Sequence, residues 1–136
     1  MPEFVRMQLA RIVINDLTNQ HVLFLKEFDG EKQFPIVIGF FEATSIDLRV
    51  TDSDRPPRPL THDLIIGVAQ SLGATIESVV ITRCEDEVFF ASLRLRRDEA
   101  VIDVDARPSD AIAVASAFRP MLPILVAKPV FDSLAN

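Results

Sequence analysis

The sequence predicts an α+β fold in a single compact domain that spans residues 1–136, with antiparallel or mixed sheets and three main helices. Two groups of three strand-like stretches are separated by short turns, which is typical of antiparallel hairpins. Between and after them, apolar residues recur every three or four positions, which is typical of helices. A chain of this length is the usual size of one domain with its own core.

The first group of strands is followed by a helix. The opening stretch alternates apolar and polar residues and is rich in Val, Ile and Leu. Asp29-Gly30 is a strong hairpin signal, and Gly39 breaks the strand that follows it. We therefore expect strands over 4–14, 21–28 and 32–38, and a helix from 40 to about 50.

A proline-rich segment and a second helix come next. Residues 52–59 contain three prolines within four positions, which forces an extended path. Residues 61–72 give the clearest helical pattern of the chain, and Gly73 follows as a stop signal. The apolar stripe of this helix consists of Leu64, Ile65, Val68, Ala69 and Leu72.

The second half repeats the order of strands and helix. Its helix is apolar nearly all round, which predicts deep burial, and Pro120 ends it. A short apolar stretch after it predicts an inner strand. The expected elements are strands over 74–84, 87–96 and 101–105, the helix over 108–118, the inner strand over 123–127 and a terminal helical turn over 129–134.

The charge balance limits the partners that the surface suits. Acidic residues exceed basic ones, which gives a formal net charge of −6. An acidic surface repels phosphate backbones, so nucleic-acid binding would need a local arginine cluster or bound cations. Eleven of the fourteen basic residues are Arg, the better residue for two-pronged phosphate contacts. The base composition of the source genome explains this preference equally well.

Cysteine content and hydropathy predict the compartment. The single Cys84 excludes an internal disulfide and fits a reducing environment. The N-terminus lacks a basic region followed by an apolar one, so no signal peptide is expected. No apolar run approaches the roughly 18 residues of a membrane helix. We expect a cytoplasmic protein without a membrane span.

Two segments carry most of the polar residues that could do chemistry, and each precedes a predicted helix. Helix capping explains part of both. Thr61 stands where an N-cap residue belongs, and Asp63 in the first turn favours the helix dipole. Pro108 suits the first helical position, and Asp110 falls at the acidic position of a capping box. The expected structural caps are Thr61, Ser109 and Asp110; the segments are RPLTHD over 58–63 and DARPSD over 105–110.

Capping leaves four residues of these segments without a role, namely Arg58, His62, Asp105 and Arg107. A helix N-terminus beside an arginine can bind an anion. Asp103 and Asp105 project from one face of a strand, and if that face meets the start of the first helix, the carboxylates could hold a divalent cation. The open alternative is that both strand carboxylates lie on a solvated face.

Three sequence blocks resemble the signature blocks of the bifunctional nuclease domain family, in the same order and at similar separations. The likeness extends from about residue 7 to residue 130, and the chain lacks only the usual acidic tail. The resemblance implies a compact α+β domain, usually found as an oligomer, in a family named after plant members credited with DNase and RNase activity. The blocks are FPIVIGFFEA (34–43), RPLTHDL (58–64) and DVDARPSDAIA (103–113).

The resemblance implies a metal-dependent nuclease that hydrolyses phosphodiester bonds in DNA, RNA or both. Carboxylates would hold Mg²⁺ or Mn²⁺, a histidine would act as general acid or base, and arginines would hold the phosphate. Glu42 is among the candidates, although the helix dipole alone explains an acid in a first helical turn. The candidates are His62, Asp63, Asp105 and Glu42 for catalysis, Asp105 and Asp63 for the metal, and Arg58 and Arg107 for the phosphate.

A different class of function stays open on the sequence alone. The chain could be a non-catalytic homo-oligomer, a binding or regulatory module whose Arg, His and Asp residues form caps, a buried ion network or a subunit interface. Caps account for Thr61, Asp63 and Asp110 without any chemistry. An acidic surface also suits protein partners better than nucleic acid.

Overall fold

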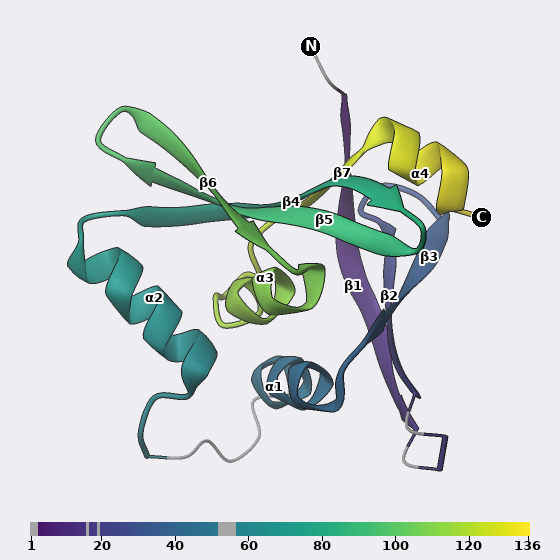
Figure 1. Ribbon diagram of the computed structural model, residues 1–136, viewed down its shortest axis with the longest axis horizontal. Helices are drawn as coiled ribbons and strands as arrows, with labels where there is room; N and C mark the ends of the chain where they lie inside the picture. Colours follow the sequence, from purple (N-terminus) through teal and green to yellow (C-terminus); the bar gives the residue numbers. More distant parts are fainter. Residues whose placement is uncertain (1–2, 16, 19, 52–56) are drawn as a thin grey trace.

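A computed structural model describes residues 3–15, 17–18, 20–51 and 57–136. These residues form one mixed sheet of seven strands, with α1, α2 and α3 below it and α4 above it in Figure 1. The strand order is β3-β2-β1-β7-β4-β5-β6. The strands are β1 (Phe4–Asn15), β2 (Gln20–Glu27), β3 (Gln33–Ile38), β4 (Thr75–Glu85), β5 (Val88–Arg97), β6 (Ala100–Ala106) and β7 (Ile124–Ala127). The helices are α1 (Phe40–Val50), α2 (Thr61–Ser71), α3 (Pro108–Ala115) and α4 (Lys128–Leu134).

The α+β class is confirmed, and the number of helices needs a small correction. The described residues contain four helices, because the expected terminal turn forms the two-turn helix α4. Val130 and Phe131 of α4 are buried, so packing stabilises a helix too short to be stable alone. The helix expected over 108–118 is shorter and ends at Ala115. Part of the proline-rich segment, 52–56, lies outside the described residues.

The short strand β7 joins the two halves of the sheet. It pairs antiparallel with β1, with Phe4 opposite Ala127, and parallel with β4, with Val79 opposite Ile124. All other strand pairs of the sheet are antiparallel, as the hairpin signals predict. Because β7 lies between the two halves, α1 from the first half and α3 from the second pack against each other on one face.

The helix α3 is the centre of the core, as its apolar composition predicts. Seven of its eight residues are buried, and it packs against β4, β5, α1 and α2. Ile112 is fully buried at its middle. The burial of α3 fixes the position of its first turn, which holds two of the candidate site residues, Ser109 and Asp110.

The starts of α2 and α3 correct the expected caps. Leu60 and not Thr61 is the N-cap residue of α2, and its backbone N–H donates a hydrogen bond to Asp63 Oδ2 at 2.9 Å. Arg107 is the N-cap residue of α3, with Pro108 in the first turn, as expected. No side chain caps either helix N-terminus directly at the N-cap position. The N3 carboxylate of α2, Asp63, therefore caps the helix from inside its first turn.

No helix in the described parts of the chain is long and apolar enough to cross a membrane.

Ile112 in α3 tests the packing of the core. Ile112→Ala should lower the free energy of unfolding by about 2–5 kcal/mol, because it removes buried methyl groups and leaves a cavity under the sheet. Urea unfolding followed by circular dichroism measures the change. Leu17→Ala is the matched control, since Leu17 is 98% exposed and its loss should change stability by less than about 0.5 kcal/mol. Equal effects of the two substitutions would contradict this placement of α3.

Candidate functional site

A histidine at the start of α2 bridges the other two helices of the lower layer. His62 is buried, and its two ring nitrogens have different partners. Nδ1 lies 2.8 Å from the hydroxyl of Ser45 on α1, and Nε2 lies 3.0 Å from Asp110 Oδ1 on α3. His62 is therefore the point at which residues from three separate helices meet.

On the α3 side, an arginine and two carboxylates extend this contact to the surface. Arg107 Nε donates to Asp110 Oδ2 at 2.9 Å, and Arg107 Nη2 donates to Glu42 Oε1 at 2.5 Å. The side chain of Arg107 is 66% exposed, whereas that of Glu42 is 14% exposed. The two acids thus hold a guanidinium group in a fixed position with much of its surface open to solvent.

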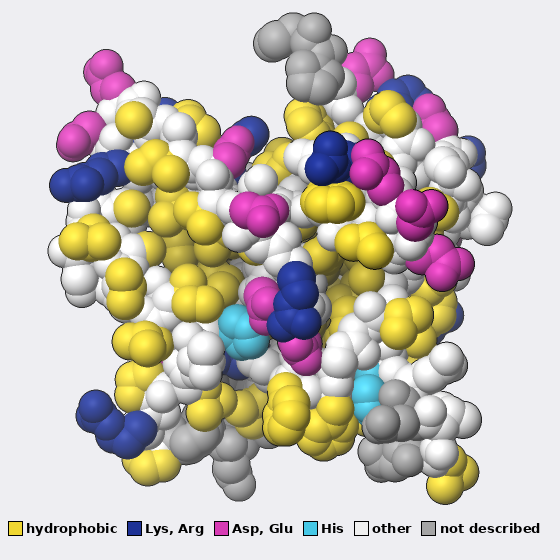
Figure 2. Space-filling model, in the orientation of Figure 1, with side chains coloured by type: hydrophobic (Ala, Val, Ile, Leu, Met, Phe, Trp, Pro, Cys, Tyr) yellow, Lys and Arg dark blue, Asp and Glu magenta, His cyan; other side chains and the backbone are white. Residues whose placement is uncertain are grey.

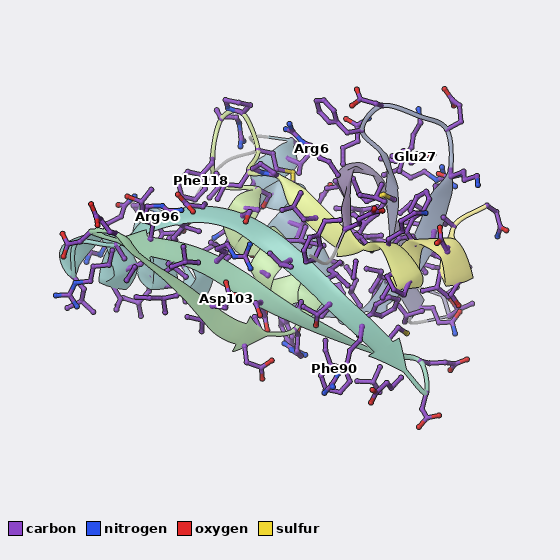
Figure 3. The ribbon with its side chains drawn as sticks, turned by 90° about the horizontal axis from the view of Figure 1, so that it is seen from above. Arg6, Glu27, Phe90, Arg96, Asp103 and Phe118 are labelled. Atoms are coloured by element: carbon purple, nitrogen blue, oxygen red, sulfur yellow. The ribbon has the colours of Figure 1, made fainter. Side chains whose placement is uncertain are left out.

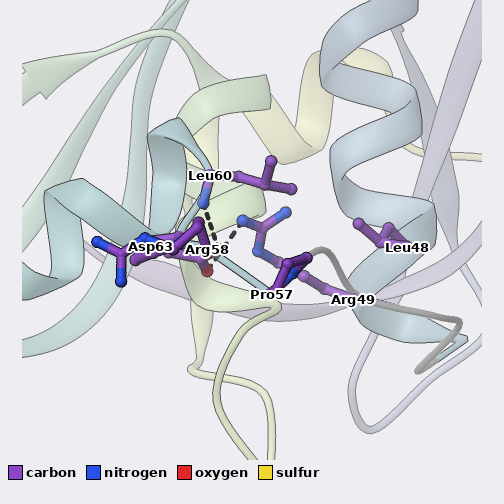
Figure 4. Close-up of a pocket in the computed structure, with 7 residues that line it drawn as sticks. Leu48, Arg49, Pro57, Arg58, Leu60 and Asp63 are labelled. Carbon is purple, nitrogen blue, oxygen red and sulfur yellow. Dashed lines mark hydrogen bonds and ion pairs between the residues drawn. The ribbon is translucent and has the colours of Figure 1, made fainter.

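On the α1 side, a buried arginine continues the network. Arg49 is 2% exposed, and its Nη1 donates to the backbone oxygen of Ser45 at 2.9 Å and to Ser45 Oγ at 2.5 Å. Arg49 Nη2 donates to Asp63 Oδ1 at 3.0 Å. Asp63 accepts this bond together with the Leu60 N–H, as the dashed lines in Figure 4 show. Burying a charged group is costly unless it is paired, and Asp63 supplies the pair.

The network lies between two surface hollows. A cleft of about 380 Å³ is lined by the first turns of α1 and α2 and includes Ser45, His62 and Asp110. A second hollow of about 250 Å³, drawn in Figure 4, is lined by Arg49, Arg58 and Asp63 among others. In Figure 2, acidic, basic and histidine side chains form a compact cluster at the centre of the face and apolar side chains surround it.

Hydrogen bonds shift the pKa values of two charged members of the network, Asp110 and Arg107. Burial raises the pKa of the Asp110 carboxyl, but hydrogen bonds from His62 and Arg107 outweigh burial, so the pKa is lowered from its ordinary value. Hydrogen bonds to Asp110 and Glu42 raise the pKa of Arg107. An ionised Asp110 fixes the orientation of the His62 ring, which is the role of the acid in histidine-based catalysis.

The structure brings together most of the predicted site residues. Glu42, His62, Arg107 and Asp110 share one set of hydrogen bonds, and Asp63 joins it through Arg49 and Ser45. Of the expected caps, Ser109 is buried and Thr61 is exposed in the first turn of α2. Asp110 contacts side chains of other elements and is no simple cap.

Two predicted site residues lie apart from this network. Asp105 is exposed on the edge strand β6, and its side chain has no hydrogen bond or ion pair with a described residue. Its neighbour Asp103, labelled in Figure 3, forms a surface ion pair with Arg94 across the sheet at 2.8 Å. Arg58 is exposed beside the second hollow and likewise has no such contact within the described chain. Of the two interpretations of the strand carboxylates, the structure therefore favours the solvated face.

The carboxylates do not fit a site for Mg²⁺ or Mn²⁺ in this arrangement. Glu42 and Asp110 are both bound to Arg107, and Asp63 is bound to Arg49. Within the residues that the structure describes, no three side chains of His, Cys, Asp or Glu converge as metal ligands. A hard cation needs several oxygen ligands around one point. No step below is therefore routed through a metal ion.

Two residues of the network were not among the sequence candidates, Ser45 and Arg49. They are four positions apart on α1, so they lie on one face of the helix. A polar pair at this spacing on the face that also carries the buried Ile46 and Ala43 is the signal that could have found them. The sequence does not show that partners on α2 lie beside this pair, so the pair looks like an ordinary contact on a helix surface.

Comparison with known proteins agrees with the three signature blocks. The model of the bifunctional nuclease domain matches residues 23–135. The chain belongs to the bifunctional nuclease domain family. All members of the polar network lie within the matched range, so the site is part of the bifunctional nuclease domain itself.

Individual relatives support the same family. The chain is 39% identical over 123 residues to an uncharacterized protein of Mycobacterium tuberculosis, which covers 90% of this chain and 71% of the relative. It is 30% identical over 118 residues to Bifunctional nuclease 1 of Oryza sativa subsp. indica and to Bifunctional nuclease of Oryza minuta. Those matches cover 83% of this chain and 34% of each rice protein, so the matched region is about a third of those relatives.

The lowered pKa of Asp110 makes stability depend on pH. A carboxyl whose pKa is lower in the folded state contributes stability above its unfolded pKa, and that contribution is lost as pH falls through the folded value. Asp110→Asn should therefore be less stable than the original chain at pH 7, and the difference should shrink below the ordinary Asp value of about 3.9. Urea unfolding between pH 7 and pH 3 measures it.

Asp105→Asn is the matched control for this measurement, because Asp105 is exposed and five residues away in the same segment. The free energy of unfolding of Asp105→Asn should depend on pH in the same way as that of the original chain. A pH-independent gap between Asp110→Asn and the original chain would show that the carboxylate of Asp110 is not held ionised by His62 and Arg107.

Proposed function

We propose that this chain hydrolyses phosphodiester bonds of nucleic acid, and that the cleft at the starts of α1, α2 and α3 is its active site. The observation that carries the proposal is His62, whose ring is held between Asp110 and Ser45 at the wall of the cleft. A histidine oriented by an ionised acid is the usual group for proton transfer near neutral pH. The membership of the family and its rice relatives named as nucleases support the choice of substrate.

Arg107 is suited to hold the phosphate. Its Nε and Nη2 atoms are bonded to Asp110 and Glu42, whereas Nη1 has no hydrogen bond with a described residue. That edge of the guanidinium faces away from its two acids and can donate to a phosphate oxygen. Because the acids fix Arg107 beforehand, little side-chain freedom is lost when an anion binds.

Local charge balance answers the objection that an acidic protein repels nucleic acid. Around the cleft, Glu42, Asp63 and Asp110 are matched by Arg49 and Arg107, and Arg58 stands beside them. The acids of the site are thus neutralised by arginines, and the excess negative charge lies elsewhere on the surface. Where the remaining acidic surface dominates, a lower salt concentration should slow the approach of the substrate, because the repulsion is less screened.

His62→Gln tests the proposed chemistry. Hydrolysis of labelled single-stranded and duplex oligonucleotides by the purified chain should fall by about 10²–10⁴-fold, because the proton-transfer group is lost. Asp105→Asn should cleave at the original rate, since Asp105 lies outside the network. Thermal unfolding of both variants checks that the fold is kept. Cleavage by His62→Gln at the original rate would remove His62 from the mechanism.

The metal that the family resemblance implies is tested in the same assay. The carboxylates of Glu42, Asp63 and Asp110 are engaged by arginines, so cleavage is expected to continue in EDTA. Loss of cleavage in EDTA and its return with Mg²⁺ or Mn²⁺ would show that the carboxylates rearrange around an ion. In that case Asp63→Asn and Asp105→Asn should weaken the response to the metal, since these two are the ligands predicted from the sequence.

A second candidate function is self-association, which an apolar groove favours. Parts of α2, β5 and β6 line a groove of about 430 Å³ that is apolar except for Arg97. Leu64 and Val68 on α2, and Leu72 at its C-cap, stay between 51% and 61% exposed. Figure 2 shows apolar side chains gathered at the left, over α2 and the adjoining strands. A groove of this kind on a small domain is typical of an interface.

The two edges of the sheet favour a second copy of the chain as the occupant. At the outer edge of β3, Gln33 exchanges two backbone hydrogen bonds with Asn136, and Pro35 has no N–H to donate. Within the described chain, β6 has a neighbour on one side only and contains no proline. Antiparallel pairing of two β6 strands about Asp103 would put Ile102 opposite Val104 of the second copy, beside both grooves.

Val68→Asp tests self-association. The original chain should have the mass of a dimer in size-exclusion chromatography with light scattering, and Val68→Asp should have the mass of a monomer, because a carboxylate in the groove opposes burial. Leu17→Asp is the control, since Leu17 is exposed in the β1–β2 turn region, away from the groove. A monomeric original chain, or a dimeric Val68→Asp, would overturn this candidate.

A further inference from the structure

The hydroxyl of Ser45 differs from the other hydroxyl of the same helical turn. Thr44 Oγ1 donates to the backbone oxygen of Phe40 at 2.9 Å, which is the ordinary contact of a hydroxyl inside a helix. Ser45 Oγ instead lies 2.8 Å from His62 Nδ1 and accepts a hydrogen bond from Arg49 Nη1. Ser45 also lines the cleft, so its hydroxyl is within reach of a bound molecule.

The partners of Ser45 decide where its proton lies. Arg49 can only donate, so it occupies a lone pair of Ser45 Oγ. The carboxylate of Asp110 accepts a hydrogen bond from the N–H of His62 Nε2, which leaves His62 Nδ1 as an acceptor in the neutral ring. The Ser45 O–H therefore donates to His62 Nδ1. This is the proton arrangement of a serine beside a general base that a third group orients.

The same contacts restrict what His62 can deprotonate. Both ring nitrogens of His62 are occupied by protein groups, one by Asp110 and one by Ser45. The proton that the ring can accept without rearrangement is the one on Ser45. Water reaches the ring nitrogen only after the Ser45 hydroxyl has moved away.

From this geometry we infer that Ser45 is the nucleophile of the proposed hydrolysis, which therefore proceeds through a covalent phosphoserine ester. This inference rests on the proposed function for its substrate, a nucleic-acid phosphodiester. The observation behind it is that His62, at the wall of the cleft, contacts Ser45 through one ring nitrogen and Asp110 through the other.

The reaction balances in two steps. In the first, Ser45 Oγ attacks phosphorus and gives its proton to His62 Nδ1; the Oγ–P bond forms, the bond from phosphorus to the leaving sugar oxygen breaks, and His62 protonates that oxygen. In the second, a water molecule takes the vacated position at His62, loses a proton to the ring and attacks phosphorus. The Oγ–P bond breaks, and Ser45 regains its proton. The sum is phosphodiester plus water giving phosphomonoester plus alcohol.

Arg49 is a positioning residue in this scheme. Its buried guanidinium is fixed by Asp63 and by the Ser45 backbone oxygen, and it donates to the oxygen on which negative charge develops. A cation that is already in place stabilises that charge without reorganisation.

Arg49→Lys should therefore shift the pH dependence of the reaction to higher pH, whereas a merely structural role would change stability alone.

A fluorophosphonate test probes Ser45 apart from any nucleic acid. The intact chain is incubated with diisopropyl fluorophosphate, digested and analysed by mass spectrometry. Ser45 should carry the diisopropyl phosphoryl group, and labelling should fall on the order of 10²-fold or more in His62→Gln. Thr44→Ala controls for loss of a hydroxyl from the same helix and should be labelled at Ser45 like the original chain. Unlabelled Ser45, or equal labelling in His62→Gln, overturns the inference.

A cleavage test then separates this inference from the proposed function. During hydrolysis of an oligonucleotide, acid quenching should trap a nucleotide on Ser45, and added glycerol should give a glyceryl phosphodiester product. Ser45→Ala should lose cleavage while keeping its fold. Cleavage at the original rate by Ser45→Ala overturns the serine nucleophile and leaves the phosphodiesterase intact. Labelling of Ser45 without cleavage of any oligonucleotide supports the nucleophile and overturns the nuclease assignment. If Ser45 is not labelled and no oligonucleotide is cleaved, both proposals are overturned.

Discussion

The rest of the architecture depends on the placement of β7, a strand of only four residues. It lies between β1 and β4 and is antiparallel to the first and parallel to the second. Without it, the chain would consist of two separate three-stranded hairpin units with a helix each. With it, α1 and α3 pack together under one sheet, and the helix between them, α2, brings its first turn to their junction. The site is a consequence of that junction.

His62 then links the junction to the proposed chemistry. It is buried where three helices meet, and a buried polar side chain is tolerated only when its hydrogen bonds are satisfied. Ser45 and Asp110 satisfy them, and their own remaining contacts run to Arg49 and Arg107. The same bonds therefore stabilise the helix packing and determine which nitrogen of the neutral ring carries the proton. For this reason a purely structural test of the network cannot separate the two roles, whereas trapping of a covalent adduct can.

Local patterns in the sequence predicted most of the elements. Hairpin signals such as Asp29-Gly30 and the apolar periodicity of residues 61–72 act over short distances, and the strands and helices lie within a few residues of the expected bounds. The parallel pairing of β7 with β4 joins residues about 45 positions apart. No local signal encodes such a contact, because it depends on how the whole sheet assembles.

The site was predicted in part, for reasons visible in single residues. The signature blocks led to Glu42, His62, Arg107 and Asp110, which the structure joins. Asp105 was grouped with them because it is close to Arg107 in sequence, but β6 holds it on the exposed edge of the sheet. Ser45 was overlooked because a serine inside a helix has a local explanation, and its partner lies on another helix.

The two ends of the sheet have different consequences for growth of the sheet. At β3, the N–H of Gln33 is bonded to Asn136 and Pro35 has no N–H, so two backbone donors are withheld from an added strand. A sheet with two receptive edges can add copies at both and extend into a fibre. With one edge closed, strand addition at β6 ends after a single step, because each new copy presents only its own closed edge. The backbone contact between Asn136 and Gln33 would thus limit how far such a sheet could extend.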